Sequence, residues 1–295
     1  MTPHPYDAIL QSATRRPEFW RLGVVFVLAL GLIGAVTPLF YSVVMSLAPE
    51  LSPFALPSDT VSTRQGGVFV VLAGFSLLLL GSILTARRLH DRSLRDITGP
   101  AALMRDQIRT TTKWIAPIVA ITLMLPWDGE GSQLVAQLPL RQWLMWVPFA
   151  LLGIAVQVTA EEVFFRGYLQ SQIAGATGSY LSGLFASAFV FGLLHYNGTL
   201  TGIGLWFTLG WAVMFGLAAG DLTARSGTLG PAIVLHFVNN ISAMLIAPPD
   251  GLFSAFGLYT RTADLSDILA DPMIIVFEAA VLFVTWLAAR IAIRR

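Results

Sequence analysis

The chain has no cysteine and few charged residues. Only 12% of its 295 residues are charged, 18 Lys and Arg against 17 Asp and Glu, whereas soluble domains average about 25%. Without cysteine there is no disulfide framework, no Cys-ligated metal site and no thiol nucleophile. With so little charge, neither a soluble domain nor a basic patch for nucleic acid has room to exist, so we expect no nucleic-acid partner.

Hydrophobic residues make up 55% of the chain and gather in stretches long enough to cross a bilayer. The sequence therefore predicts an all-α membrane protein, a polytopic bundle of about eight transmembrane helices in the lipid bilayer. The candidate spans are 20–46, 68–86, 114–126, 143–172, 179–196, 201–220, 228–247 and 272–289. The third is short and contains Pro117, so an interfacial or re-entrant segment, and hence seven spans, is the alternative.

The distribution of basic residues favours eight spans. With eight, all but three of the Lys and Arg side chains fall on one side of the membrane, and the exceptions are Arg64, Arg141 and Arg261. The positive-inside rule then places both termini in the cytoplasm. We do not expect a cleavable signal peptide, because the first span is longer than the apolar region of a signal peptide and is preceded by about 19 residues of mixed polar character. We expect an integral multi-pass protein, of the plasma or inner membrane if the source is bacterial.

Costly polar residues interrupt the spans of the second half. Each ionisable group at mid-membrane costs about 2.5 to 3.5 kcal/mol on insertion scales, so a set of them indicates function. Glu162 and Arg166 are four residues apart and can form an ion pair on one helix face, whereas Glu161 points about 100° away. His195 and His236 are the two histidines that lie within spans.

Three short motifs carry these residues: Glu161-Glu162-Val-Phe-Phe-Arg166, Phe191-Gly-Leu-Leu-His195 and His236-Phe-Val-Asn-Asn240. In order and on three different spans, they resemble the EExxxR, FxxxH and HxxxN motifs of the CAAX-processing and bacteriocin-processing (CPBP, or ABI) family of intramembrane peptidases. Within that family, the chain is similar to the Ras-converting CAAX prenyl endopeptidases. We expect three parts: 1–142 with the first three helices, a catalytic core at 143–247, and 248–295 with an outer loop and the last helix.

The resemblance implies an intramembrane endopeptidase with a polar, water-filled cavity. Glu161 would be the general base and His195 would help to hold the water. His236 and Asn240 would bind the oxyanion, with Glu162, Arg166 and Phe191 in support. Such a set meets the needs of amide hydrolysis, namely a base and donors aimed at the oxyanion.

The cofactor is left open between none and zinc. Glu161, His195 and His236 would be the zinc ligands, but the HExxH signature is absent, which favours no tightly bound metal. The partner is a peptide or protein substrate, and the sequence does not decide whether that substrate is lipidated or tethered to the membrane.

Other functional classes fit less well. Gly220-Asp221 lacks the rest of an aspartyl-protease GxGD motif, and Ser226-Gly227 lies in a polar turn rather than at a rhomboid nucleophile position. The serious alternative is a non-catalytic protein, either a carrier with a proton relay or a scaffold or bacteriocin-immunity protein. Glu278 could join such a relay, but the first half has no matching polar positions.

Overall fold

The computed structural model describes residues 5–49, 61–124, 134–249, 251–261, 263 and 265–294. Much of the chain expected to connect the first span to the second, and the third to the fourth, lies outside these ranges. The part described is almost entirely helical, which confirms the predicted fold class.

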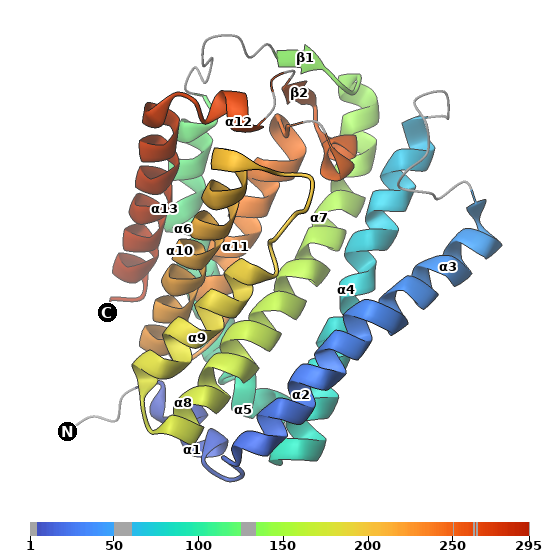
Figure 1. The fold of residues 1–295 in the computed structure, drawn as a ribbon. Helices are drawn as coiled ribbons and strands as arrows, with labels where there is room; N and C mark the ends of the chain where they lie inside the picture. The colour runs from blue at the N-terminus through green and yellow to red at the C-terminus, as the bar shows by residue number, and fades with distance from the viewer. Residues whose placement is uncertain are drawn as a thin grey trace.

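Within the described residues, eight helical segments run back and forth between two ends of the bundle (Figure 1). Each of the eight predicted spans overlaps one of them, and residues 125 and 126 of the third span lie outside the described residues. In chain order they are α2 (Phe19–Gly31) with η1 (Leu32–Val36) and α3 (Thr37–Leu47); α4 (Val61–His90); α6 (Ala101–Thr122); α7 (Leu140–Glu162) with η3 (Val163–Gln170) and α8 (Ser171–Thr177); α9 (Tyr180–Leu193); α10 (Gly202–Ser226); α11 (Gly230–Ile241) with η4 (Ser242–Ile246); and α13 (Pro272–Ala292).

Five helical segments within the described residues are long and apolar enough to cross a membrane: Phe19–Leu47, Arg64–His90, Leu140–Thr177, Gly202–Ser226 and Pro272–Ala292. Tyr180–Leu193 and Gly230–Ile246 are apolar but shorter. A helical membrane bundle is therefore the architecture of the chain.

The third span differs most from its prediction. Helix α6 begins at Ala101, well before the expected start at 114, and continues through Pro117 to Thr122. Its first half carries Arg105, Arg109 and Lys113, which hydropathy alone does not assign to a span. The helix packs along α11 and α13, and this tertiary contact stabilises a continuous helix where the sequence also allowed a re-entrant piece.

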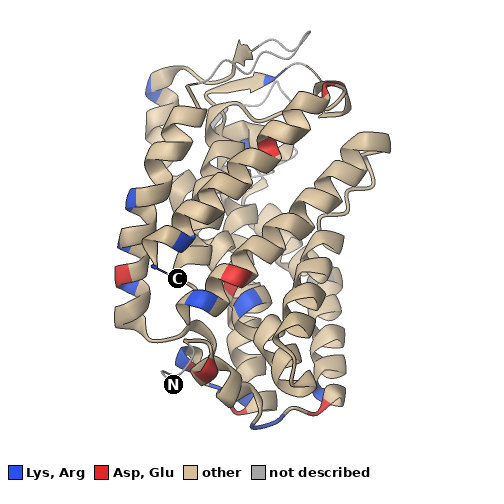
Figure 2. Ribbon diagram, turned by 90° about the vertical axis from the view of Figure 1, so that its left-hand side faces the viewer, with Lys and Arg blue, Asp and Glu red and all other residues tan. Residues whose placement is uncertain are grey.

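Short elements close both ends of the bundle. α1 (Asp7–Ala13) and α5 (Leu94–Thr98) lie at the end that also holds α8 (Figure 1). At the opposite end, β1 (Leu134–Ala136) pairs antiparallel with β2 (Tyr259–Arg261), beside η5 (Leu252–Phe256) and α12 (Leu265–Ile268). Most Lys and Arg residues lie in the half of the bundle that carries α1 (Figure 2), as the charge distribution predicts.

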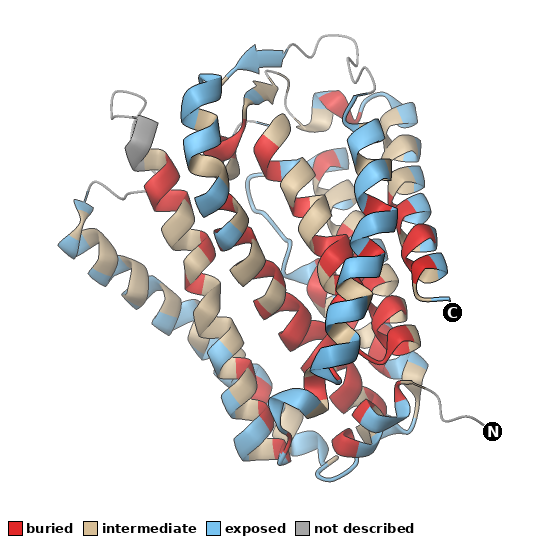
Figure 3. Cartoon of the chain, turned by 180° about the vertical axis from the view of Figure 1, so that it is seen from behind, coloured by how far each residue is buried: buried red, intermediate tan, exposed pale blue. Residues whose placement is uncertain are grey.

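Burial is concentrated on the central helices, whereas the outer faces are exposed (Figure 3). Many of the exposed side chains are large and hydrophobic. The α2–α3 segment is the extreme case, because Phe26, Val27 and Leu39 are all more than half exposed. Exposed apolar side chains on this scale are unfavourable in water and favourable in lipid. The α2–α3 segment therefore presents most of its surface to the bilayer.

A buried arginine fastens α1 to the rest of the bundle. Arg92 is 1% exposed. Its guanidinium donates to Ser12 Oγ at 3.0 Å, Gln172 Oε1 at 3.0 Å and Ser171 Oγ at 2.9 Å. Burial lowers the pKa of Arg92 to about 10, so the side chain stays protonated at neutral pH. Through these bonds α1 is tied to α8, which ends the helix that carries Glu161.

Two glycines let α9 and α10 approach closely. A side chain at Gly192 would overlap Val213, and a Cβ at Gly216 would come within 2.9 Å of the Ala188 Cα. Small residues at such contacts are typical of helix pairs in membranes. The close approach stacks Phe191 of α9 on Phe215 of α10, with ring centroids 6.0 Å apart.

Candidate active site

Two consecutive carboxylates lie at the end of α7, deep in the bundle. Glu161 is 7% exposed and Glu162 is fully buried. Immediately after them the helix widens into the π-helix η3, from Val163 to Gln170. Such π segments are rare and occur frequently at functional sites.

His236 of α11 lies between these two carboxylates. Its Nδ1 is 2.7 Å from Glu162 Oε1, and its Nε2 is 3.7 Å from Glu161 Oε2. Because an ionised carboxylate only accepts hydrogen bonds, Nδ1 carries a proton and donates a hydrogen bond to Glu162. Glu162 thereby fixes the ring so that Nε2 faces Glu161, as a buried acid orients the histidine of a catalytic triad.

Arg166 completes the support of Glu162. Its Nη1 donates to the same oxygen, Glu162 Oε1, at 3.0 Å, and the pair is 1% and 0% exposed. The guanidinium lies 4.3 Å from the ring centre of Phe191, close enough for a cation–π contact. The expected ion pair is therefore present, and the structure adds His236 to it as a third member.

Asn240, one turn after His236, is linked to Glu161 by hydrogen bonds through Gln157, a residue that the sequence analysis did not single out. Asn240 Nδ2 donates to Gln157 Oε1 at 3.3 Å, and Gln157 Nε2 donates to Glu161 Oε1 at 3.2 Å. Gln157 is 8% exposed and lies one turn before Glu161 on α7. Sequence reasoning missed it, although a glutamine in an apolar run four residues before a membrane-buried glutamate was an available signal.

His195 is the member that the structure does not join to the others. It follows the end of α9, and its Nδ1 donates to the Phe191 carbonyl oxygen at 2.8 Å, which leaves Nε2 free to accept. Among the described residues, His195 is linked to His236 only through Phe191, whose ring centre is 4.5 Å from His195 and 6.0 Å from His236.

Residues 142–242 match the family model described as type II CAAX prenyl endopeptidase, Rce1-like. Over these residues the chain is similar to the CAAX-protease family. The match supports a peptidase of the CAAX-protease type at family level. No curated protein and no solved structure matches the chain significantly. The matched residues include all three motifs, and the division of the chain into three parts stays a prediction.

The motif residues, as the structure arranges them, do not form a group that could hold a metal ion. Within the described residues, no three His, Asp or Glu side chains are grouped so that they could hold one. The Nδ1 atoms of His236 and His195 are bonded to Glu162 and to a backbone carbonyl, so only their Nε2 atoms are open to a ligand. Within the described residues Glu161, His195 and His236 are not grouped as one ligand set, and we derive no step through a metal.

The residues of the rejected protease classes have local structural contacts. Asp221 pairs with Arg225 at 2.8 Å and accepts from Trp286 Nε1 at 3.0 Å. The Ser226 hydroxyl donates to the Thr228 carbonyl at 2.7 Å within the turn between α10 and α11. These contacts suit helix-end and turn roles.

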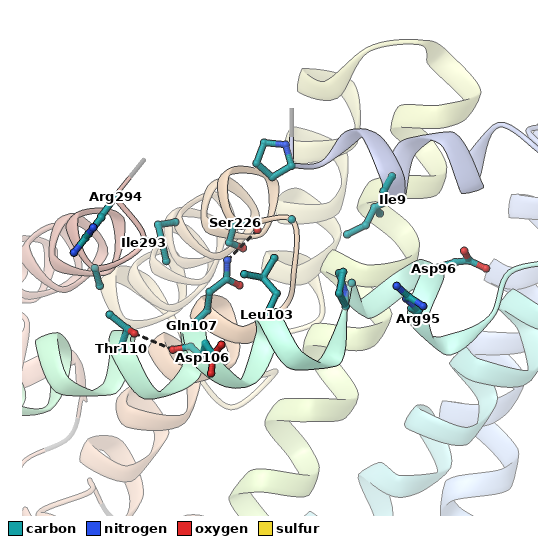
Figure 4. A pocket seen from close by; sticks show the side chains of 16 residues that line it. Ile9, Arg95, Asp96, Leu103, Asp106, Gln107, Thr110, Ser226, Ile293 and Arg294 are labelled. Carbon is teal, nitrogen blue, oxygen red and sulfur yellow. Dashed lines mark hydrogen bonds between the residues drawn. The ribbon is translucent and has the colours of Figure 1, made fainter. Parts of the chain in front are cut away.

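A cavity of about 500 Å³ lies away from the motif residues, between α1, α6, the α10–α11 turn and the end of α13. Figure 4 shows Gln107 of α6 bonded across it to the Ser226 carbonyl, at 3.0 Å. A smaller cavity of about 90 Å³ is lined by Phe215, Asn239 and Glu278. Glu278 thus faces a different space from Glu161.

Proposed function

We propose that this CAAX-family protein hydrolyses peptide bonds with a water activated by Glu161. The observation that carries the proposal is the position of His236, held by Glu162 and Arg166 with its Nε2 toward Glu161. A buried base beside an oriented imidazole and an amide donor is the set of groups that amide hydrolysis requires.

In the proposed reaction, Glu161 takes a proton from water as the oxygen attacks the scissile carbonyl carbon. The oxyanion that forms accepts a hydrogen bond from the second hydrogen on Asn240 Nδ2. It accepts another from His236, which for this role must carry a proton on Nε2 as well as on Nδ1. Glu161 then passes its proton to the leaving nitrogen, the C–N bond breaks, and an amine and a carboxylic acid are released. His195, with its Nε2 free, would bind the attacking water from the α9 side.

We infer that the substrate is a peptide held at the membrane and that it enters from the end of the bundle that carries α1. Glu161 is nearer in sequence to the end of its span at Thr177 than to the start at Leu140. His236 lies close to the start of α11 at Gly230. Both positions are nearer the arginine-rich end, which we expect to face the cytoplasm.

The test compares Glu161→Gln with Glu278→Gln, the same substitution at another glutamate within a span. Both proteins should fold, but only Glu161→Gln should lose cleavage of membrane-tethered peptides, by about 10² to 10⁴-fold, because general-base removal has that effect. His195→Ala should cause a similar loss, and the double variant with Glu161→Gln should be little worse, because the two residues would act as a unit.

Retained cleavage by Glu161→Gln, or an equal loss in Glu278→Gln, would remove Glu161 from the role of base. A carrier or scaffold function would then account for the buried polar residues.

A further inference from the structure

Three amide side chains form a directed chain of hydrogen bonds that ends on the proposed base. Asn239 Nδ2 donates to Asn240 Oδ1 at 3.2 Å, Asn240 donates to Gln157 at 3.3 Å, and Gln157 donates to Glu161 at 3.2 Å. Each amide in the middle uses its oxygen on one side and its nitrogen on the other. The chain connects the two helices that supply the base and the oxyanion donor.

The direction of this chain is fixed from the Glu161 end. An ionised carboxylate only accepts, so Gln157 must turn its NH₂ toward Glu161 and its oxygen toward Asn240. Asn240 must then turn its NH₂ toward Gln157. One Nδ2 hydrogen of Asn240 is used in this bond, and the other remains for a substrate oxygen.

Without Gln157, the Asn240 amide is held in this chain only by the bond from Asn239 Nδ2 at 3.2 Å, and it can turn over when Asn239 presents its own oxygen instead. It would then present its oxygen to the oxyanion, which is repulsive, in place of a hydrogen-bond donor. Glu161 would also lose the donor on Oε1, and with it one constraint on its side-chain rotamer. Small misplacements of this kind cost catalysis because the reacting groups must be held within a fraction of an ångström.

We propose that Gln157 is a positioning residue, which orients Glu161 and sets the Asn240 amide with its NH₂ toward the substrate. This inference rests on the proposed function of the same site. Gln157 touches both groups but not the reacting atoms, so its removal should slow the chemical step and leave substrate binding nearly unchanged.

The experiment compares Gln157→Met with Gln170→Met. Gln170 is a matched control because it is 1% exposed, lies further along the same continuous helix, and donates to the Gly220 carbonyl at 3.1 Å, away from the motif residues. We expect kcat of Gln157→Met to fall about 10 to 100-fold, the value of a hydrogen bond to a charged group, with KM within about twofold. Gln170→Met should keep its kcat, and both variants should unfold at similar temperatures.

Infrared spectroscopy provides a readout that does not depend on cleavage. The difference spectrum between the wild-type protein and Glu161→Gln identifies the carboxyl band of Glu161. That band should shift in Gln157→Met, which has lost the donor, and stay in place in Gln170→Met. If Gln157→Met folds poorly, Gln157→Asn keeps an amide that is too short to reach both partners and should give the same band shift.

The outcomes separate the two proposals. An active wild-type protein whose kcat and Glu161 band are unchanged in Gln157→Met would overturn the positioning role and leave the proposed function standing. A band shift in a protein that cleaves no peptide would overturn the proposed function and leave the placement of Glu161 by Gln157 intact.

Discussion

Replacing Arg166 with Met should destabilise the protein far more than the same change at Arg225. Arg166 pairs with Glu162 inside the bundle, where the side chains are 1% and 0% exposed, whereas Arg225 pairs with Asp221 at 37% and 20% exposed. Both pairs have the same spacing of four residues, so helix geometry is matched and burial differs.

The expected loss of unfolding free energy depends on whether the substitution leaves an unpaired charge inside the bundle or in contact with solvent. Removing one partner of a buried pair costs about 3–5 kcal/mol, since a charge remains without compensation. The bond from His236 Nδ1 still reaches Glu162, so we expect the lower part of that range for Arg166→Met. The Arg225–Asp221 pair is partly exposed to solvent, so its removal should cost closer to the value for surface pairs, about 0–1 kcal/mol. The two variants should therefore differ by at least about 2 kcal/mol.

The free energy of unfolding can be measured by titrating SDS into detergent micelles and following the fluorescence of the eight tryptophans. Glu162→Gln combined with Arg166→Met removes both charges and should recover part of the loss. Equal costs for Arg166→Met and Arg225→Met, or no recovery in the double variant, would refute the uncompensated-charge argument and reassign the pair to a solvated helix end.

Three further predictions test other parts of the molecule. Reporter domains fused after Arg88 and after Arg295 should both report the cytoplasm, and an external signal from either would change the number of spans. Purified protein should hold well under one zinc per chain and keep its activity after chelation, whereas zinc that is lost and restored together with activity would make His195 and His236 ligands. Arg92→Met should leave the buried carbonyls and hydroxyls around α1 without their donor, which should lower the free energy of unfolding by about 1–3 kcal/mol. Protease cleavage at Arg15 and Arg16 should then become faster. An unchanged cleavage rate would mean that α1 is held by its apolar contacts alone.

Features that depend on local spacing and on the surrounding solvent could be predicted from the amino-acid sequence alone. Apolar stretches of span length and one-sided arginines are enough to predict a membrane bundle, because a segment in lipid must satisfy its backbone hydrogen bonds internally, as a helix does. The Glu162–Arg166 pair was predictable for the same reason, since residues four apart on a helix are neighbours. The family resemblance likewise rested on three short motifs that the chain carries in order.

Contacts between distant parts of the chain were decided only by the tertiary structure. Glu162 and His236 are 74 residues apart, and no spacing rule says that one imidazole will lie between two consecutive carboxylates. The hydrogen bond from Asn240 of α11 to Gln157 of α7, and with it the direction of the Asn240 amide, depends on how these two helices pack. His195 shows a different limit, because the motif gave its place in the chain but not its separation from Glu161 and His236 in the bundle. Side-chain direction at a buried site is fixed by neighbours from other helices, and those neighbours are known only once the bundle has formed.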